Sequence, residues 1–117
     1  MIQATERQIE VSILQLLTYS GYYCYRNRDQ AKKIGNSYRS DPWEFRGQSD
    51  LEVFVQGRVI FLEVKTPKGR QSQHQKDYQA QCDKHNIPYH IVTSAKQALE
   101  IVTALDSGRS KIDSKRL

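Results

Sequence analysis

Apolar residues near the start of the chain recur at helical spacing and then give way to a β-prone tract. The first pattern predicts a helix over residues 6–20, with Thr5 as its N-cap. Residues 22–28 are rich in tyrosine and predict the first strand. Residues 29–47 are polar and have no stable period, which predicts a long loop.

Two short apolar runs in the middle of the chain, residues 51–55 and 58–64, predict a β-hairpin. Gln56-Gly57 between them is the predicted two-residue turn. Apolar residues fall on both faces of these strands. We therefore expect the hairpin to be central in a sheet that helices cover.

The C-terminal part of the chain contains two further helical patterns and one strand. Ser72 is predicted to cap a helix over residues 73–85, and residues 88–93 predict a fourth strand. Ser94 is predicted to cap a third helix. Its apolar residues are Ala98, Leu99, Ile101, Val102 and Leu105. Residues 106–117 are predicted to form a basic polar tail.

The hairpin brings charged residues together at one end of the predicted sheet. With a two-residue turn, Asp50 lies directly opposite Glu63, and Lys65 points to the same face as Glu63. Like charges in opposite positions destabilise a sheet, and a divalent cation between the two carboxylates would remove this penalty. Hard oxygen ligands without thiolate or imidazole suit Mg²⁺ or Mn²⁺. The pattern predicts a small metal site, with Lys65 placed to stabilise an anionic transition state.

Length, charge and cysteine content narrow the class of protein. The chain has 117 residues, and residues 1–105 are predicted to form a single domain. No apolar run is long enough to span a bilayer, so we expect a soluble, cytoplasmic protein without a membrane partner. The two cysteines give no disulfide framework, which fits a reducing compartment. Eighteen Lys and Arg against thirteen Asp and Glu give a net charge of +5, which suits a polyanionic partner.

Basic residues that suit contact with nucleic-acid phosphates lie in two stretches. The predicted loop contributes Lys32, Lys33 and Arg39, interleaved with aromatic residues on which bases could stack. Lys68 and Arg70 follow the hairpin, beside the predicted metal site. An ordinary solvated loop or turn carries the same residue types, so both interpretations stay open.

Three motifs follow one another around the predicted site. They are Gly47-x-x-Asp50, Glu63-x-Lys65 within the segment Leu62-Glu63-Val64-Lys65-Thr66-Pro67-Lys68-Gly69-Arg70, and Ser72-x-x-Gln75. Together with the order helix, strand, hairpin, helix, strand, helix, they resemble the VRR-NUC family of the PD-(D/E)XK nuclease superfamily. The resemblance covers residues 5 to 105, approximately. Ser49 stands where the superfamily name has proline, at a position that often varies.

The resemblance implies a restriction-endonuclease-like α/β fold. Its αβββαβ core has a central mixed four-stranded sheet flanked by helices, and this chain adds a C-terminal helix. In the family pattern Asp50 and Glu63 would bind the metal directly, and Val64 would contribute its carbonyl oxygen. Lys65 would orient or polarise the water or the phosphate.

Two further positions of the family pattern fall outside the hairpin. Glu6 on the first helix matches an additional acidic position, with Glu10 one turn further as the alternative. Gln75 matches a glutamine near the metal site.

The resemblance and the charge together predict a metal-dependent DNA endonuclease that hydrolyses phosphodiester bonds with Mg²⁺ or Mn²⁺. Small single-domain members of the family resemble junction-resolving enzymes, so branched DNA such as four-way junctions is the expected substrate. One site cuts one strand at a time, and cutting two strands symmetrically implies a homodimer. The alternatives are a flap or nicking nuclease and a non-catalytic nucleic-acid-binding module with the same fold.

Two other interpretations concern individual residues. Glu63 and Lys65 could form an ion-pair ladder on an exposed strand face, although this leaves the clash between opposite carboxylates unexplained. His74, Cys82 and His85 could share one helix face and suggest zinc, but a single short helix rarely supplies enough ligands.

Overall fold

The structure is a computed structural model that describes residues 3–27, 33–34, 37–38 and 49–116.

The predicted helix caps form in the structure. The side chain of Thr5 accepts a hydrogen bond of 3.1 Å from the backbone N–H of Gln8, whose side chain accepts one of 2.9 Å from Thr5 in return. Ser72 makes the same reciprocal arrangement at the second helix, and Ser94 Oγ caps the third. These bonds satisfy N–H groups that a helix start leaves without partners.

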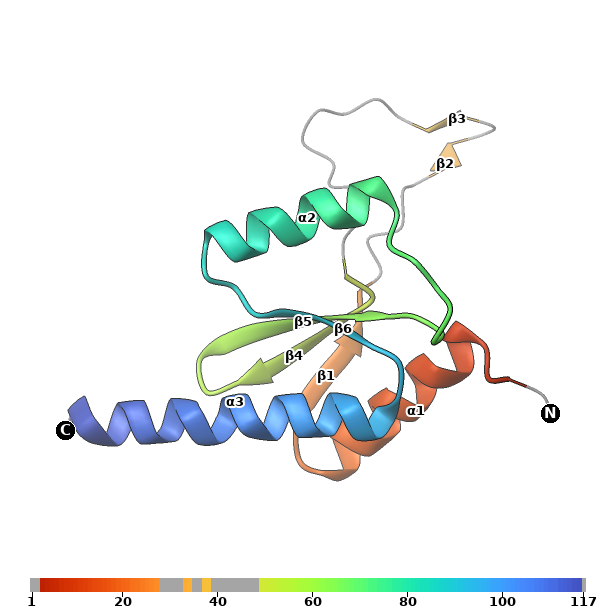
Figure 1. Ribbon diagram of the computed structural model, residues 1–117. Helices are drawn as coiled ribbons and strands as arrows, with labels where there is room; N and C mark the ends of the chain where they lie inside the picture. Colours follow the sequence, from red (N-terminus) through yellow and green to blue (C-terminus); the bar gives the residue numbers. More distant parts are fainter. Residues whose placement is uncertain (1–2, 28–32, 35–36, 39–48, 117) are drawn as a thin grey trace.

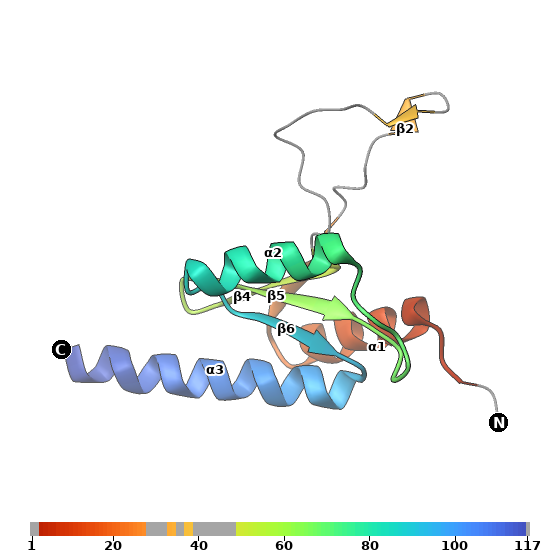
Figure 2. The same cartoon turned by 45° about the horizontal axis from the view of Figure 1, so that its top comes forward.

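A four-stranded mixed sheet forms the centre of the fold (Figure 1). In the order of the sheet its strands are β1 (Tyr23–Arg26), β4 (Leu51–Val55), β5 (Arg58–Val64) and β6 (Tyr89–Val92). Neighbouring strands are antiparallel from β1 to β5, whereas β6 is parallel to β5. A parallel pair needs a crossover connection, which α2 (Gln73–Lys84) provides. Figure 2 shows β5 and β6 side by side and pointing in the same direction.

The hairpin has the predicted register and turn. Val55 pairs with Arg58, and Leu51 pairs with Leu62. The turn residues Gln56 and Gly57 both have left-handed backbones, with φ angles of 48° and 80°. Two successive positive φ angles are typical of a type I′ turn, whose twist matches that of the flanking strands.

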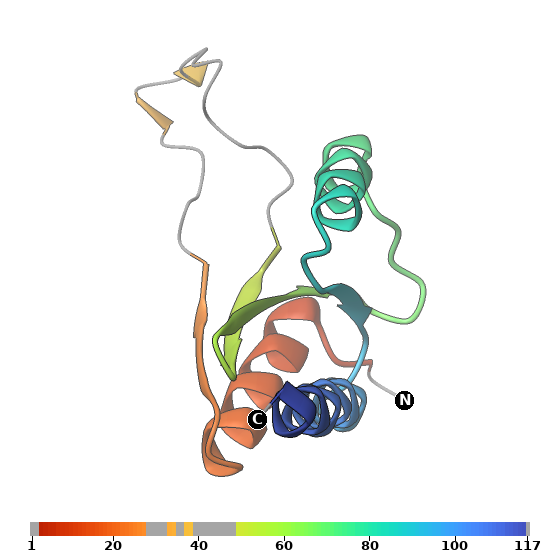
Figure 3. The same ribbon diagram turned by 90° about the vertical axis from the view of Figure 1, so that its left-hand side faces the viewer.

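Helices cover both faces of the sheet (Figure 3). The first helix, α1 (Glu6–Tyr19), and the last, α3 (Ala95–Arg116), lie on one face, and α2 lies on the other. The buried core between α1, α3 and the sheet consists of Ile9, Ile13, Leu17, Leu51, Val53, Val55, Ile60, Leu62, Val64, Val92, Ala98 and Val102. The predicted central hairpin between helical layers is confirmed. No helix within residues 3–27 and 49–116 is long and apolar enough to cross a membrane.

The last helix, α3, continues to Arg116, into the stretch that the sequence predicts to be a polar tail from residue 106. Asp106 accepts a hydrogen bond of 3.0 Å from the Tyr22 hydroxyl and one of 2.5 Å from Gln56 Nε2. These contacts connect α3 to the residue before β1 and to the hairpin turn, where the tail was expected to begin. The following residues contain no proline, and extending a formed helix is far easier than starting one.

The stretch predicted as one long loop contains two short strands. They are β2 (Lys33–Ile34) and β3 (Ser37–Tyr38), which pair antiparallel in a separate sheet. The loop prediction is wrong for these four residues. In the sequence, the dipeptide Gly35-Asn36 stands between them, and this dipeptide is frequent in hairpin turns. It is the sequence feature from which the two strands could have been predicted. Lys32 and Arg39 lie outside the described residues, as does the side chain of Lys33.

Candidate active site

Asp50 lies directly before β4 and is held against the end of β5. Its Oδ2 atom accepts a hydrogen bond of 2.7 Å from the backbone N–H of Val64. Its backbone carbonyl accepts one of 2.8 Å from the N–H of Asn27, which follows β1. The preceding residue, Ser49, is buried and donates its hydroxyl to the carbonyl of Leu51. The ends of β1 and β5 therefore hold Asp50 at the start of β4, and the bond from Val64 positions its carboxylate.

Glu63, the penultimate residue of β5, has a completely buried side chain. Its Oε1 atom accepts hydrogen bonds from the Tyr89 hydroxyl and, at 3.3 Å, from Gln71 Nε2. Its Oε2 atom is buried and has no hydrogen-bond partner. The two oxygens of one carboxylate thus have different surroundings.

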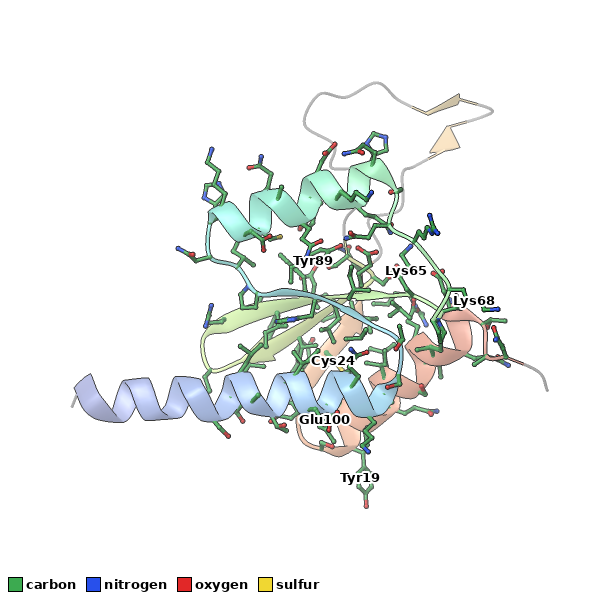
Figure 4. All side chains as sticks on the ribbon, viewed as in Figure 1. Tyr19, Cys24, Lys65, Lys68, Tyr89 and Glu100 are labelled. Carbon is green, nitrogen blue, oxygen red and sulfur yellow. The ribbon has the colours of Figure 1, made fainter. Side chains whose placement is uncertain are left out.

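Lys65 provides the positive charge next to this oxygen. Its Nζ lies 3.7 Å from Glu63 Oε2, which is within ion-pair distance but beyond a normal hydrogen bond. The Lys65 side chain is 12% exposed and that of Glu63 is 0% exposed. An ion-pair ladder on an exposed strand face is therefore excluded for this pair. Figure 4 shows Lys65 at the end of the sheet and Tyr89 between the sheet and α2.

Burial raises the pKa of Glu63 above its ordinary value. The hydrogen bond from Gln71 and the charge of Lys65 act in the opposite direction, while the charge of Asp50 raises this pKa further. The raised pKa means that the ionised carboxylate is destabilised where it stands.

Burial also raises the pKa of Asp50, against the effect of the hydrogen bond from Val64. The charges of Glu10 and Glu6 raise it further, and the charge of Lys65 lowers it. Two neighbouring carboxylates that both resist ionisation mark a place where additional positive charge would be stabilising.

The first-helix acids differ in their surroundings. Glu6 is exposed, whereas Glu10 is ion-paired with Arg26 at the end of β1. The negative charges of both raise the pKa of Asp50, and Glu10 has the larger effect.

Within the described residues, no group of three or more His, Cys, Asp and Glu side chains could hold a metal ion. Glu6 is therefore not gathered into a cluster with Asp50 and Glu63, and the zinc set of the second helix is not formed either.

Gln75, the predicted glutamine of the site, makes the capping box of α2. Its Oε1 accepts a hydrogen bond of 2.8 Å from the backbone N–H of Ser72. The glutamine that contacts Glu63 is Gln71, which sequence reasoning missed. Gln71 Nε2 also donates to Gln79 Oε1 at 3.0 Å, so a residue of α2 helps to orient it.

The turn after β5 carries the two remaining basic candidates. Lys68 and Arg70 are exposed. The backbone N–H of Gly69 donates to the carbonyl of Thr66 at 2.8 Å, which closes the turn. A side chain at Gly69 would come within 3.3 Å of Lys65 Cδ, so the glycine lets the turn pack close to that lysine. Both cations thus lie on a turn that begins at the candidate site.

The residues present fit a small divalent cation. Asp50 and Glu63 supply anionic oxygens, and one oxygen of Glu63 is buried without a partner. The ammonium group of Lys65, 3.7 Å away, lowers the pKa of Glu63, yet burial leaves this pKa raised. Further positive charge at this oxygen would therefore be stabilising. The donor set contains oxygen only, which Mg²⁺ and Mn²⁺ prefer.

The fold and the site together define a restriction-endonuclease-like α/β domain with two carboxylates and a lysine at one end of its sheet. A solved structure described as a VRR_NUC domain matches the chain with a TM-score of 0.58 and 18% sequence identity. The match covers 86% of this chain and 97% of that one. It shows that the two have the same fold and supports the resemblance to VRR-NUC domains. No family model and no curated protein matches the sequence.

Proposed function

We propose that this protein is a metal-dependent nuclease that hydrolyses phosphodiester bonds in DNA. The observation that carries the proposal is the fully buried Glu63, whose Oε2 atom has no hydrogen-bond partner and faces Lys65 at 3.7 Å. A buried carboxylate with one open oxygen is poorly explained as a structural element, because the open oxygen costs stability. The likeness to a VRR_NUC domain structure supports nuclease chemistry at this site.

Asp50, Glu63 and the carbonyl of Val64 would hold Mg²⁺ or Mn²⁺. The ion would supply charge neutralisation at the scissile phosphate and a lowered pKa for water. Lys65 stabilises negative charge that develops on the phosphate, because its ammonium group already lies at the rim of the carboxylate pair. Gln75 and Glu6 remain candidates for contacts that form only with bound DNA and metal.

The basic side chains provide the electrostatic part of DNA binding. The net charge of +5 favours a polyanion, and Lys68 and Arg70 are exposed on the turn beside the site. We place Lys32, Lys33 and Arg39 in the same role. Branched DNA, with four-way junctions as the leading substrate, and a homodimer that cuts two strands symmetrically complete the proposal.

Cleavage assays on linear, nicked, flap and four-way-junction DNA test this function. With Mg²⁺ or Mn²⁺ we expect cleavage by the wild type, loss of cleavage in Glu63→Gln and Asp50→Asn, and retained DNA binding in both variants. Glu100→Gln is the matched control, because Glu100 is an exposed acid on α3, outside the site (Figure 4). DNA binding without cleavage in any condition would favour the non-catalytic module instead. A mass near 13.6 kDa by light scattering would contradict the homodimer.

A further inference from the structure

The two oxygens of Glu63 are divided between different partners. Oε1 accepts from the Tyr89 hydroxyl on β6 and from Gln71 on the segment before α2. Oε2 has no hydrogen-bond partner and lies 3.7 Å from the ammonium nitrogen of Lys65. Tyr89 and Gln71, from two separate parts of the chain, thus both donate to Oε1. Oε2 is also buried but accepts no hydrogen bond.

Both donors are held in place by their own surroundings. The Tyr89 side chain belongs to a residue that is 5% exposed, and its ring lies 6.0 Å from that of Tyr78 on α2. The amide nitrogen of Gln71 donates to Glu63 and to Gln79 Oε1, which fixes the direction of its amide group. The carboxylate of Glu63 therefore has little freedom to rotate.

We infer that Tyr89 and Gln71 are positioning residues, which restrict Glu63 to a single free oxygen and thereby make the site select a small divalent ion over Ca²⁺. The inference rests on the proposed metal-dependent function. Ca²⁺ accommodates carboxylates that bind through both oxygens and tolerates irregular geometry, whereas Mg²⁺ and Mn²⁺ suit single-oxygen ligands in regular octahedral sites. With Oε1 already accepting two hydrogen bonds, Glu63 offers Oε2 alone.

Residues that orient a metal ligand contribute strongly to ion affinity, although they do not touch the ion. Their loss weakens metal binding by about 10- to 100-fold in general. Removing either donor leaves Oε1 with a single hydrogen bond, so the carboxylate turns more easily to present both oxygens, which benefits Ca²⁺ more than Mn²⁺. The inference thus predicts a change in ion preference as well as a loss of affinity, and a purely structural role predicts neither.

Ion binding to the full chain without DNA tests the inference. Free Mn²⁺ is measured by electron paramagnetic resonance during titration, and Ca²⁺ is then added as competitor. The test variants are Tyr89→Phe and Gln71→Met, each of which removes a donor at nearly constant volume. The control is Tyr22→Phe, which removes a tyrosine hydroxyl bonded to Asp106, outside the site. Thermal melting of every variant establishes that it is folded.

We expect Tyr89→Phe and Gln71→Met to bind Mn²⁺ about 10-fold more weakly than the wild type, with Ca²⁺ competing relatively better. Tyr22→Phe should keep wild-type affinity and ion preference. If both test variants keep the wild-type Mn²⁺ affinity and Ca²⁺ competition while Glu63→Gln loses Mn²⁺, the positioning role is overturned and the proposed function stands. Wild-type protein without Glu63-dependent Mn²⁺ binding would overturn the metal site of the proposed function itself.

Discussion

The carboxylate of Asp50 accepts a hydrogen bond of 2.7 Å from the backbone N–H of Val64. This bond joins the start of β4 to the end of β5, at the place where the candidate ligands meet. Asp50 therefore has a structural role that does not depend on any ion. The same carboxylate has a pKa raised chiefly by burial, so its charge costs stability while its hydrogen bond provides some.

Substitutions of Asp50 should separate these two contributions. Asparagine retains an oxygen that can accept from Val64, so Asp50→Asn should cost less than about 1 kcal/mol of unfolding free energy. Alanine leaves the N–H without its acceptor, and Asp50→Ala should cost about 1–3 kcal/mol. Urea denaturation without divalent ions measures both values. Equal stability of the two variants would show that the bond to Val64 contributes nothing.

The raised pKa of Glu63 gives a pH dependence of defined sign. Because the native state holds the proton of this carboxyl group more tightly than the unfolded chain does, native stability falls as the pH rises from the ordinary value of 4.5 through the raised native value. The amide in Glu63→Gln does not ionise, so this variant lacks that loss of stability. We expect the variant to be more stable than the wild type at neutral pH, with a gap that widens as the pH rises through this window.

The measurement is urea denaturation of both proteins at a series of pH values, first with a chelator and then with Mg²⁺. Bound Mg²⁺ should stabilise the wild type and narrow the gap at neutral pH. A gap that stays constant from pH 4 to pH 7 would contradict the raised pKa of Glu63.

Local signals predicted most of the fold. Thr5, Ser72 and Ser94 cap helices because the groups that they satisfy lie within the next few residues. The turn at Gln56-Gly57 fixes the hairpin register in the same local way, and this register placed Asp50 beside the end of β5. The extent of α3 could not be predicted, since its anchors come from distant parts of the chain.

The surroundings of the site depend on contacts across the sequence. Tyr89 is 26 residues from Glu63, and Arg26 is 16 residues from Glu10. The positions of Asp50 and Glu63 at the end of the sheet could be predicted, since only a hairpin separates these two residues. The hydrogen bond from Tyr89 to Glu63 could not be predicted, because no local motif determines the parallel register of β6 on β5.

The pair of Glu10 and Arg26 offers a test of how the first helix is connected to the site. Arg26→Met leaves Glu10, whose side chain is 13% exposed, without its partner. A partly buried pair lies between an exposed and a buried one, so we expect a loss of about 1–3 kcal/mol in unfolding free energy. Glu10→Gln in the same background should recover part of that loss, because the unpaired charge is gone. A double-mutant cycle by urea denaturation gives the coupling, and additive effects would argue against the ion pair.

Asp106 should be the main anchor between α3 and the edge of the sheet. Asp106→Ala removes the acceptor of both Tyr22 and Gln56, and we expect a loss of about 1–3 kcal/mol. Glu100→Ala, at an exposed position of the same helix, should change stability by less than about 0.5 kcal/mol. Hydrogen exchange should show the added opening of α3 in the Asp106 variant alone. Equal exchange in the two variants would mean that this anchor is not needed.

Lys65→Met should separate catalysis from ion binding. The ammonium group lies 3.7 Å from Glu63 Oε2, so it repels a cation that binds there while it stabilises negative charge on a phosphate. We expect cleavage to fall about 100- to 1,000-fold, the range for loss of one group that stabilises the transition state. Mn²⁺ affinity should stay the same or increase, because a like charge has been removed. Single-turnover cleavage and Mn²⁺ titration measure the two effects. A parallel loss of both would show that Lys65 acts by holding Glu63 in place and not on the phosphate.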